Sequence, residues 1–205
     1  MNDFFEASVL LLVILNPFGL SVYLVDMYRS VSLRQLGSIM LRASLISGAV
    51  FALFAAAGDA IFTDVLHLRF AAFQVFGGIL FLGVALRFML SGSETLVQLR
   101  GEPGRVAGAV AMPFMIGPGT VSAATIAGLR LDLPFALLAV AAALATAVII
   151  LLLLKVAFDR VQKRNAALVE RYVETAGRVS AMVVGSIAVE MVFVGIDAWW
   201  RSPPS

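Results

Sequence analysis

Apolar residues fill long stretches of this chain, and short polar segments separate those stretches. A helix rises 1.5 Å per residue, so about 20 apolar residues suffice to cross the hydrocarbon core of a bilayer. Six stretches approach or exceed that length, at residues 4–25, 36–57, 70–90, 106–129, 133–154 and 179–198. We therefore expect an all-α integral membrane protein with six transmembrane helices in a single membrane domain, residues 1–205.

A charged segment connects the fifth stretch to the sixth. Residues from about 157 to 178 carry too many charges to enter the bilayer. Val161, Leu168 and Tyr172 fall on one helical stripe with basic residues around it. Two interpretations fit this pattern: a helix that lies on the cytoplasmic membrane surface, or a solvated loop helix that packs on the bundle.

Composition and charge placement support a multi-pass membrane protein. Of the 205 residues 61% are hydrophobic and 14% are charged, and there is no cysteine, which excludes disulfides and thiolate metal sites. Most of the 15 lysine and arginine residues lie around the three odd-numbered connections, and the other side holds Arg69, Arg130 and Arg201. The positive-inside rule then places those connections in the cytoplasm and both termini outside, in a bacterial or archaeal cytoplasmic (inner) membrane.

The same observations limit the functions that we expect. The excess of basic residues is explained by membrane orientation, so no nucleic-acid partner is needed. The spans contain no nucleophile–base pair, no HExxH motif and no phosphate-binding loop. We therefore expect no enzymatic activity, no cofactor and no metal.

Two of the stretches are interrupted near their middle. The first contains Asn16-Pro17-Phe18-Gly19, and the fourth contains Gly117-Pro118-Gly119. Asparagine and glycine are good N-cap residues, and proline is favoured at the first position of a helix. Each interruption therefore resembles the start of a second half-helix, although a kink healed by neighbouring helices is the alternative for either one alone.

The two interruptions lie about half a chain apart, which divides the sequence into repeats of about residues 1–100 and about residues 105–200. Each repeat has three spans, and because three is odd the second repeat enters the membrane from the opposite side. Discontinuous helices 1 and 4 would then point their half-helix N-termini at each other, which favours an anionic group such as a carboxylate. Broken helices at matching places in two inverted repeats are typical of secondary transporters.

Glycines cluster in the second and third stretches, at Gly48, Gly77, Gly78 and Gly83. Because glycine has no side chain, helices can approach closely where it faces a neighbour. We expect these four glycines to lie at helix–helix contacts.

Four segments together resemble the MarC family: ILNPFG in the first stretch, RASLI at 42–46, FGGILFL at 76–82 and MPFMIGPGT at 112–120. The resemblance implies six spans, outside termini and discontinuous first and fourth helices. It also implies glycine- or alanine-sized substrates in at least some members. Carried over to this chain, it suggests a binding site made of Asn16, Pro17, Phe18, Gly19, Gly117, Pro118, Gly119 and Thr120.

Hydroxyl residues follow both interruptions. Ser21 and Ser122 could complete the polar lining of the site, together with Thr120. The alternative is a hydrogen bond back to the preceding turn, which is common for serine and threonine in membrane helices. We further expect Phe18 and Phe114 to limit the size of the substrate side chain.

Three charged residues fall inside the predicted spans. Arg87 is close enough to the cytoplasmic end of its span for its side chain to reach the headgroups. Arg42 lies deeper, so it either reaches the headgroups in the same way or lines the inner vestibule. Glu190 lies about nine residues before Trp199, too far for a glutamate side chain to reach the interface. Glu190 therefore either couples transport to a proton or Na⁺, or binds the substrate ammonium, or forms an ion pair with Arg42 or Arg87.

The sequence thus favours a secondary transporter for a small zwitterion, a neutral amino acid of glycine or alanine size. It would work by alternating access around the facing breaks. Two alternatives stay open: a channel-like pore, in which the broken helices form a fixed constriction, and a non-transporting scaffold or lipid-interacting protein. The sequence does not determine the oligomeric state.

Overall fold

Helices account for all regular structure in the residues that the computed structural model describes, which are 2–58, 60–65, 67–91, 107–108 and 110–201. The α-helices are α1 (Asn2–Leu15), α2 (Pro17–Tyr23), α3 (Val25–Ser30), α4 (Leu33–Ala57), α5 (Phe70–Ser91), α7 (Pro118–Arg130), α8 (Leu133–Arg164) and α9 (Ala166–Arg201). Two π-helical turns are η1 (Ile61–Val65) and η3 (Ala111–Met115). The prediction of an all-α chain is confirmed over these residues.

Five helical stretches of the described residues are long and apolar enough to cross a membrane. They are Asp3–Tyr23, Leu33–Ala57, Phe70–Arg87, Leu133–Arg164 and Ala181–Arg201. The expected fourth stretch, residues 106–129, is not among them. Its described helix α7 has 13 residues, fewer than the ~20 that a crossing needs, and residues 106 and 109 lie outside the description.

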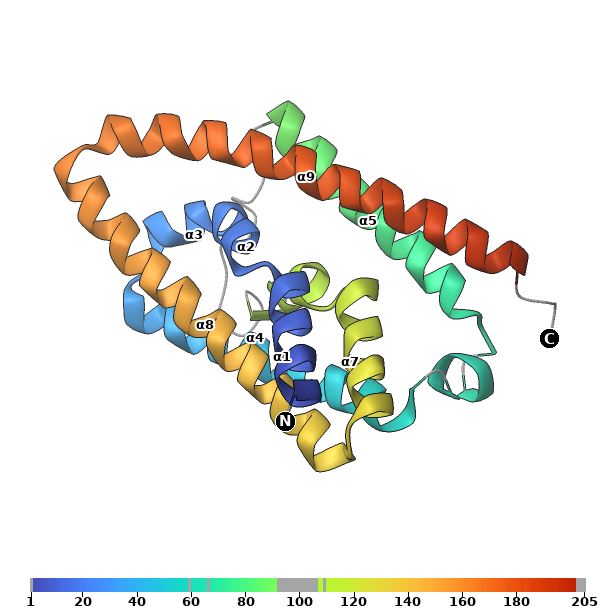
Figure 1. Ribbon diagram of the computed structural model, residues 1–205. Helices are drawn as coiled ribbons and strands as arrows, with labels where there is room; N and C mark the ends of the chain where they lie inside the picture. The colour runs from blue at the N-terminus through green and yellow to red at the C-terminus, as the bar shows by residue number, and fades with distance from the viewer. Residues whose placement is uncertain (1, 59, 66, 92–106, 109, 202–205) are drawn as a thin grey trace.

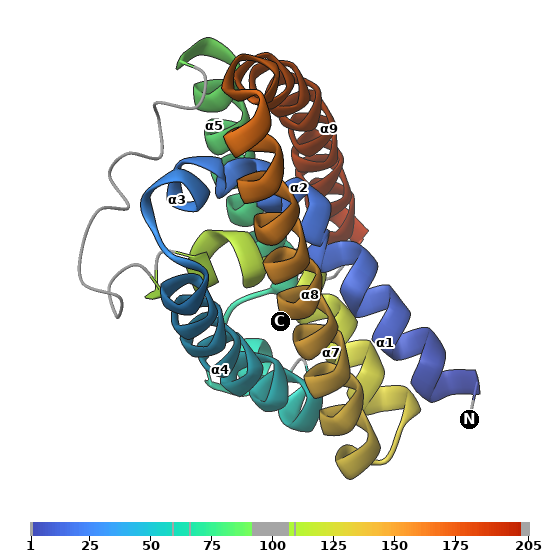
Figure 2. The ribbon, with the colours of Figure 1, turned by 90° about the vertical axis from the view of Figure 1, so that its left-hand side faces the viewer.

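Four helices, α1, α4, α7 and α8, form a bundle around the main hydrophobic core (Figure 2). α4 and α1 each pack against both α7 and α8. The contacts rely on small residues, since α8 buries Ala139, Ala143 and Ala147 along one face. A side chain at Gly128 of α7 would collide with the main chain of Ala55 in α4. Such close backbone approach is how helices associate in lipid, where the hydrophobic effect does not drive them together.

α5 and α9 lie side by side beside this bundle as an antiparallel pair (Figure 1), which we call the α5–α9 pair. A Cβ atom at Gly78 would lie 2.8 Å from the Ala188 carbonyl oxygen, and one at Gly195 would lie 3.0 Å from the Ala71 carbonyl oxygen. The contact is reciprocal because both helices carry the same pattern, Ala71, Val75 and Gly78 in α5 and Ala188, Val192 and Gly195 in α9. Each of the two glycines therefore faces the main chain of the other helix.

The expected role of glycines in helix contacts is confirmed for three positions. The first is Gly78. The second is Gly77, which lies against Pro118 of α7, and the third is Gly48, where a Cβ atom would lie 3.3 Å from a Leu144 methyl group of α8. The expectation is wrong for Gly83, since no described residue lies within 4 Å of its Cβ position. Gly83 lies in the same apolar stretch as Gly77 and Gly78, but it is exposed and faces away from the partner helices.

A separate helix over residues 157–178, expected from the charge pattern, is not what the structure contains. α8 continues without interruption to Arg164, Asn165 leaves the helical conformation, and α9 starts at Ala166 and continues to Arg201. The helix ends within the polar run Lys163-Arg164-Asn165. The charged residues thus extend two long helices beyond their apolar segments instead of forming a third one.

Lys155 in α8 is a buried cation that holds α3 against the bundle. The residue is 4% exposed, and its Nζ donates hydrogen bonds to the Tyr28 carbonyl oxygen at 2.6 Å and to Asp159 Oδ1 at 2.5 Å. A buried ammonium is costly unless it is paired in this way. The Tyr28 hydroxyl donates to the Leu151 carbonyl oxygen at 3.1 Å, and burial raises the pKa of that hydroxyl, so it remains a donor at neutral pH.

Candidate functional site

The first break separates α1 from α2 at Asn16, whose backbone is left-handed, with φ of 43° and ψ of 67°. Asparagine tolerates this conformation better than most residues. Its side-chain oxygen accepts a hydrogen bond from the Gly19 N–H at 3.1 Å, so Asn16 is the N-cap of α2, and Pro17 is the first helical residue. A Cβ at Gly19 would lie 2.6 Å from Asn16 Nδ2, so this close approach requires glycine.

The second break separates η3 from α7 and is closed by a different hydrogen bond. Gly117 is extended, with φ of −136° and ψ of 169°, and Pro118 starts α7. The hydroxyl of Thr120, a residue that is 4% exposed, accepts a hydrogen bond from the Gly117 N–H at 2.9 Å. Its single proton is shared between the carbonyl oxygens of Met115 and Gly117, both at 2.9 Å. The Thr120 hydroxyl therefore holds the two sides of the break together.

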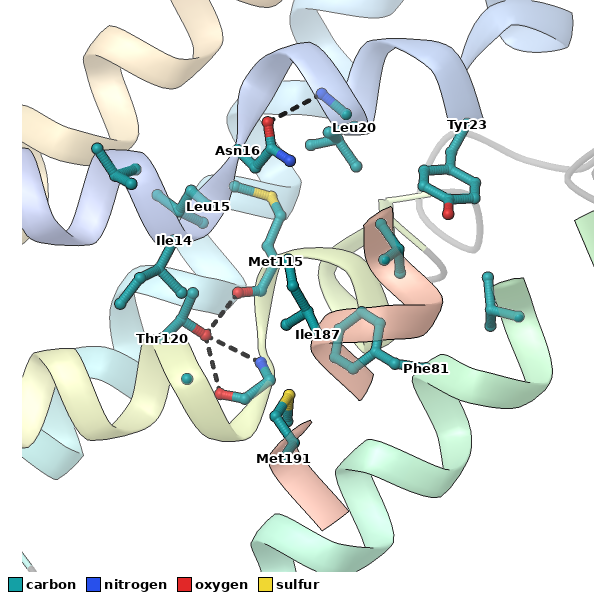
Figure 3. Close-up of a pocket in the computed structure, with 16 residues that line it drawn as sticks. Ile14, Leu15, Asn16, Leu20, Tyr23, Phe81, Met115, Thr120, Ile187 and Met191 are labelled. Atoms are coloured by element: carbon teal, nitrogen blue, oxygen red, sulfur yellow. Dashed lines mark hydrogen bonds between the residues drawn. The ribbon is translucent and has the colours of Figure 1, made fainter. Parts of the chain in front are cut away.

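Both breaks border one cavity of about 380 Å³ (Figure 3), a volume in the range of small-molecule sites. The lining residues are Val13, Ile14, Leu15, Asn16, Gly19, Leu20, Tyr23, Phe81, Val84, Met115, Gly117, Gly119, Thr120, Val184, Ile187 and Met191. The breaks also touch each other, because the Cβ position of Gly119 lies 3.1 Å from Ile14 Cγ2. Segments from opposite halves of the chain thus meet at one place.

The α5–α9 pair supplies the wall of the cavity that faces the breaks. Phe81 of α5 and Ile187 and Met191 of α9 lie across from Asn16 and Thr120 in Figure 3. The sequence interpretation missed these three residues as site residues. The only signal was the FGGILFL segment, which contains Phe81 but does not indicate which helix face meets the breaks.

Two glycine contacts place α5 against the second break. Gly77 lies directly on the Pro118 ring, and one helical turn later Phe81 lies against Gly117, whose Cβ position is 2.9 Å from Phe81 Cε2. Residues four apart share one face of a helix, so the same face of α5 makes both contacts. A side chain at Gly77 or at Gly117 would push Phe81 away from its present position.

The breaks leave backbone groups of the lining residues without their helical partners. Pro17 has no N–H to give to the Val13 carbonyl, and the Gly19 N–H is bonded to Asn16 instead of the Leu15 carbonyl. Gly117 offers no side-chain cap to the first turn of α7, where the N–H of Gly119 lies. Carbonyl acceptors and N–H donors are therefore present next to a largely apolar wall.

Charged groups are absent from this arrangement as far as the structure describes it. No charged side chain among the described residues lines the cavity. Nor do three His, Cys, Asp or Glu side chains of the described part of the chain gather where they could hold a metal ion. Recognition in this cavity would rest on backbone groups, the Asn16 amide and hydroxyls.

The family model described as MarC family integral membrane protein matches residues 1–200. The chain belongs to the MarC family. A relative from Pyrococcus horikoshii, described as a UPF0056 membrane protein, is 28% identical to this MarC chain over 128 residues. That match covers 60% of this chain and 62% of the relative, less than two thirds of the relative's length. No solved structure matches the chain.

In this MarC family member, five of the residues expected at the site line the cavity, namely Asn16, Gly19, Gly117, Gly119 and Thr120. Pro17 and Pro118 are buried at the first position of their helices and are not among the lining residues. Phe18 is 62% exposed and does not line the cavity, and the side chain of Phe114 lies outside the description. The expected size limit therefore finds no support in the cavity lining for Phe18, and for Phe114 it falls outside the described side chains.

The two serines of the MarC site prediction also lie outside the cavity lining. The Ser21 hydroxyl donates to the Phe18 carbonyl oxygen at 2.6 Å, which is the bond to the preceding turn that the sequence left open. Ser122 is partly buried on α7. Of the three hydroxyl residues expected at the site, Thr120 is the one that lines the cavity.

The three charged candidates of this MarC chain are exposed on three different helices. Arg42 is on α4, Arg87 is on α5 and Glu190 is on α9. Among the described residues, no ion pair joins Glu190 to either arginine. Glu190 precedes Met191, which lines the cavity, but is not itself part of the lining.

Proposed function

We propose that this MarC family member is a secondary transporter that moves a small neutral amino acid across the cytoplasmic (inner) membrane. One observation carries the proposal. The interruptions at Asn16 and Gly117, half a chain apart in sequence, border a single cavity. Helix interruptions that converge on a cavity inside a membrane protein are where secondary transporters bind substrate and coupling ion.

We propose further that the chain consists of two inverted repeats with discontinuous first and fourth helices, and that these alternate access to the cavity. Two features support this arrangement. Both breaks begin a helix with proline after a polar or flexible residue. The α5–α9 pair, the third span of each half, packs through the reciprocal Gly78 and Gly195 contacts expected of a two-fold relation. In the usual mechanism of alternating access, one repeat rocks against the other around a fixed binding site.

The freed groups suggest how a zwitterion would bind. The substrate carboxylate would accept hydrogen bonds from the Asn16 amide and from N–H groups in the first turn of α7, where the helix dipole favours negative charge. The ammonium would donate to carbonyls such as those of Val13 and Leu15, which lack helical donors. The family resemblance suggests glycine- or alanine-sized substrates, and both fit in a cavity of about 380 Å³.

Three further elements complete the proposal: the orientation of the termini, which follows the charge pattern, the driving ion and the fate of the substrate. Both termini lie outside, the gradient of a proton or Na⁺ drives the substrate, and the protein performs no chemical conversion of it.

The proposal is tested by counterflow. Purified protein is reconstituted in proteoliposomes preloaded with unlabelled alanine, and the entry of radiolabelled alanine is followed against empty vesicles. We expect saturable, accelerated exchange that Asn16→Ala abolishes and that Phe18→Ala retains, since Phe18 does not line the cavity. Flux that does not saturate would favour a channel. No flux from folded protein with any amino acid would favour the scaffold alternative.

A further inference from the structure

The cavity has two chemically different sides. The side built by the breaks holds its polar groups: the Asn16 side chain, the Thr120 hydroxyl and the main chain at Gly117 and Gly119. The opposite side belongs to the α5–α9 pair and presents Phe81, Val84, Val184, Ile187 and Met191. Figure 3 shows Phe81, Ile187 and Met191 across the cavity from Thr120 and Asn16. Among the described residues, the α5–α9 pair itself contributes only apolar side chains to the cavity, and Tyr23 of α2, which packs with Val84 and Val184, adds a phenol ring with its hydroxyl beside them.

The apolar side has a fixed position. Gly77 rests on Pro118 one helical turn before Phe81, and Phe81 rests on Gly117, so the ring cannot move toward the break. Behind it, α5 is packed against α9 through the close contacts of Gly78 and Gly195. The apolar side is thus formed by helix packing in the absence of a substrate.

The volume of the cavity exceeds what a glycine or an alanine would fill. A cavity of about 380 Å³ is in the range of sites that hold drug-sized ligands. If the two charged ends of an amino acid bind at the breaks, the side chain extends toward Phe81, Ile187 and Met191. A hydrogen atom or a methyl group would leave that apolar surface uncovered. Each methylene buried there gains affinity through the hydrophobic effect.

We propose that the preferred substrate is a neutral amino acid with a large apolar side chain, aliphatic or thioether, such as leucine or methionine. This inference rests on the proposed function and specifies its substrate class. The breaks bind the charged ends, which all amino acids share, and the α5–α9 pair selects the side chain. Glycine and alanine bind at the same place, but more weakly.

The first test is competition in the alanine counterflow assay with wild-type protein. Glycine, alanine, leucine, methionine and asparagine are added as unlabelled competitors. One buried methylene is worth a factor of about four, and leucine carries three more carbon atoms than alanine. We expect leucine and methionine to half-inhibit exchange at concentrations lower than alanine by about tenfold or more. Asparagine, similar in size to leucine but polar, should compete no better than alanine.

The second test fills the cavity from the apolar side. Val184→Phe places a ring on the lining, whereas Val183→Phe places one on the neighbouring residue, which is 50% exposed and outside the lining. We expect Val184→Phe to raise the half-inhibiting concentration of leucine relative to that of alanine by about tenfold, and Val183→Phe to leave this ratio as in wild type. If Val184→Phe does not fold, the first test still decides the inference, because it uses only wild-type protein.

The outcomes separate this inference from the proposed function. If alanine is exchanged but leucine and methionine compete no better than alanine, the inference is wrong and the transporter proposal stands. It is equally wrong if Val183→Phe and Val184→Phe change selectivity to the same extent. If no amino acid is exchanged or raises the melting temperature of the folded protein, the transporter proposal itself fails.

Discussion

The two breaks look alike in sequence, but each is closed by a different one of the two hydrogen bonds that make up a capping box. At the first break the N-cap side chain, Asn16, accepts a hydrogen bond from the N–H of the third helical residue, Gly19. At the second break the side chain of the third helical residue, Thr120, accepts a hydrogen bond from the N–H of the N-cap, Gly117. A full capping box would contain both bonds at once.

This difference indicates a division of roles. Only the Asn16 oxygen is used by the cap, so its amide nitrogen remains on a partly buried side chain at the cavity. The Thr120 hydroxyl uses its proton and one of its two acceptor positions on the main chain of the second break. We infer that the Asn16 side chain at the first break is a binding group and that the Thr120 side chain at the second break is a rigid support. Four substitutions test this comparison, in order of decreasing effect on stability.

The largest loss of stability is expected from Thr120→Val. Valine has nearly the shape of threonine but leaves the Gly117 N–H and the Met115 carbonyl without their partner. Each unsatisfied buried group costs about 1–3 kcal/mol. Thermal unfolding of purified protein should show a clear drop in melting temperature, and Thr120→Ser, which keeps the hydroxyl, should recover most of it. A melting temperature for Thr120→Val equal to that of wild type would contradict the support role.

Gly77→Ala should have the next largest effect. The new methyl group would collide with the Pro118 ring at the second break, and overpacking of this kind costs about 1–3 kcal/mol. Gly83→Ala is the matched control on the same helix, because no described residue lies within 4 Å of its Cβ position. The control should be neutral or slightly stabilising, since alanine favours helix over glycine. Equal melting temperatures for the two variants would show that α5 does not support the break.

Asn16→Gly should change transport far more than stability. Glycine adopts the left-handed conformation of Asn16 freely, and replacing a cap residue by glycine costs only a few tenths of a kcal/mol. The variant removes the amide that we propose as a substrate ligand. We expect a melting temperature close to that of wild type and loss of alanine counterflow. If this variant exchanged alanine at the rate of wild type, the proposed binding role of Asn16 would be wrong.

Glu190→Gln should have the smallest effect. The side chain is exposed, lies outside the cavity lining and has no ion pair with Arg42 or Arg87. Glutamine keeps the size of glutamate and removes a charge that is costly inside a membrane span, so we expect no loss of stability. Counterflow should therefore continue, with no drop in melting temperature. If uptake instead lost its dependence on a proton or sodium gradient, Glu190 would be the coupling residue.

Much of the candidate site was predictable because helix starts are local events. Asn16 before Pro17 identifies an N-cap from sequence alone, and the structure contains that cap. The hydrogen bond that closes the second break was harder to predict from the sequence. Thr120 was expected near the site, but a threonine at that position can bond to many groups, and only the folded break shows that it bonds to Gly117 and Met115. The charged segment at 157–178 was misjudged, because charge indicates exposure but does not indicate where a long helix ends.

The sequence by itself determined the membrane class, the helical content, the positions of both interruptions and the MarC family. These are properties of short segments: hydrophobicity, proline geometry and capping act within a few residues. The tertiary structure alone decided that the two interruptions share a cavity and that Phe81, Ile187 and Met191 form its other side. Those contacts join residues far apart in the chain, and they depend on which helix faces fit together, as Gly77 fits Pro118.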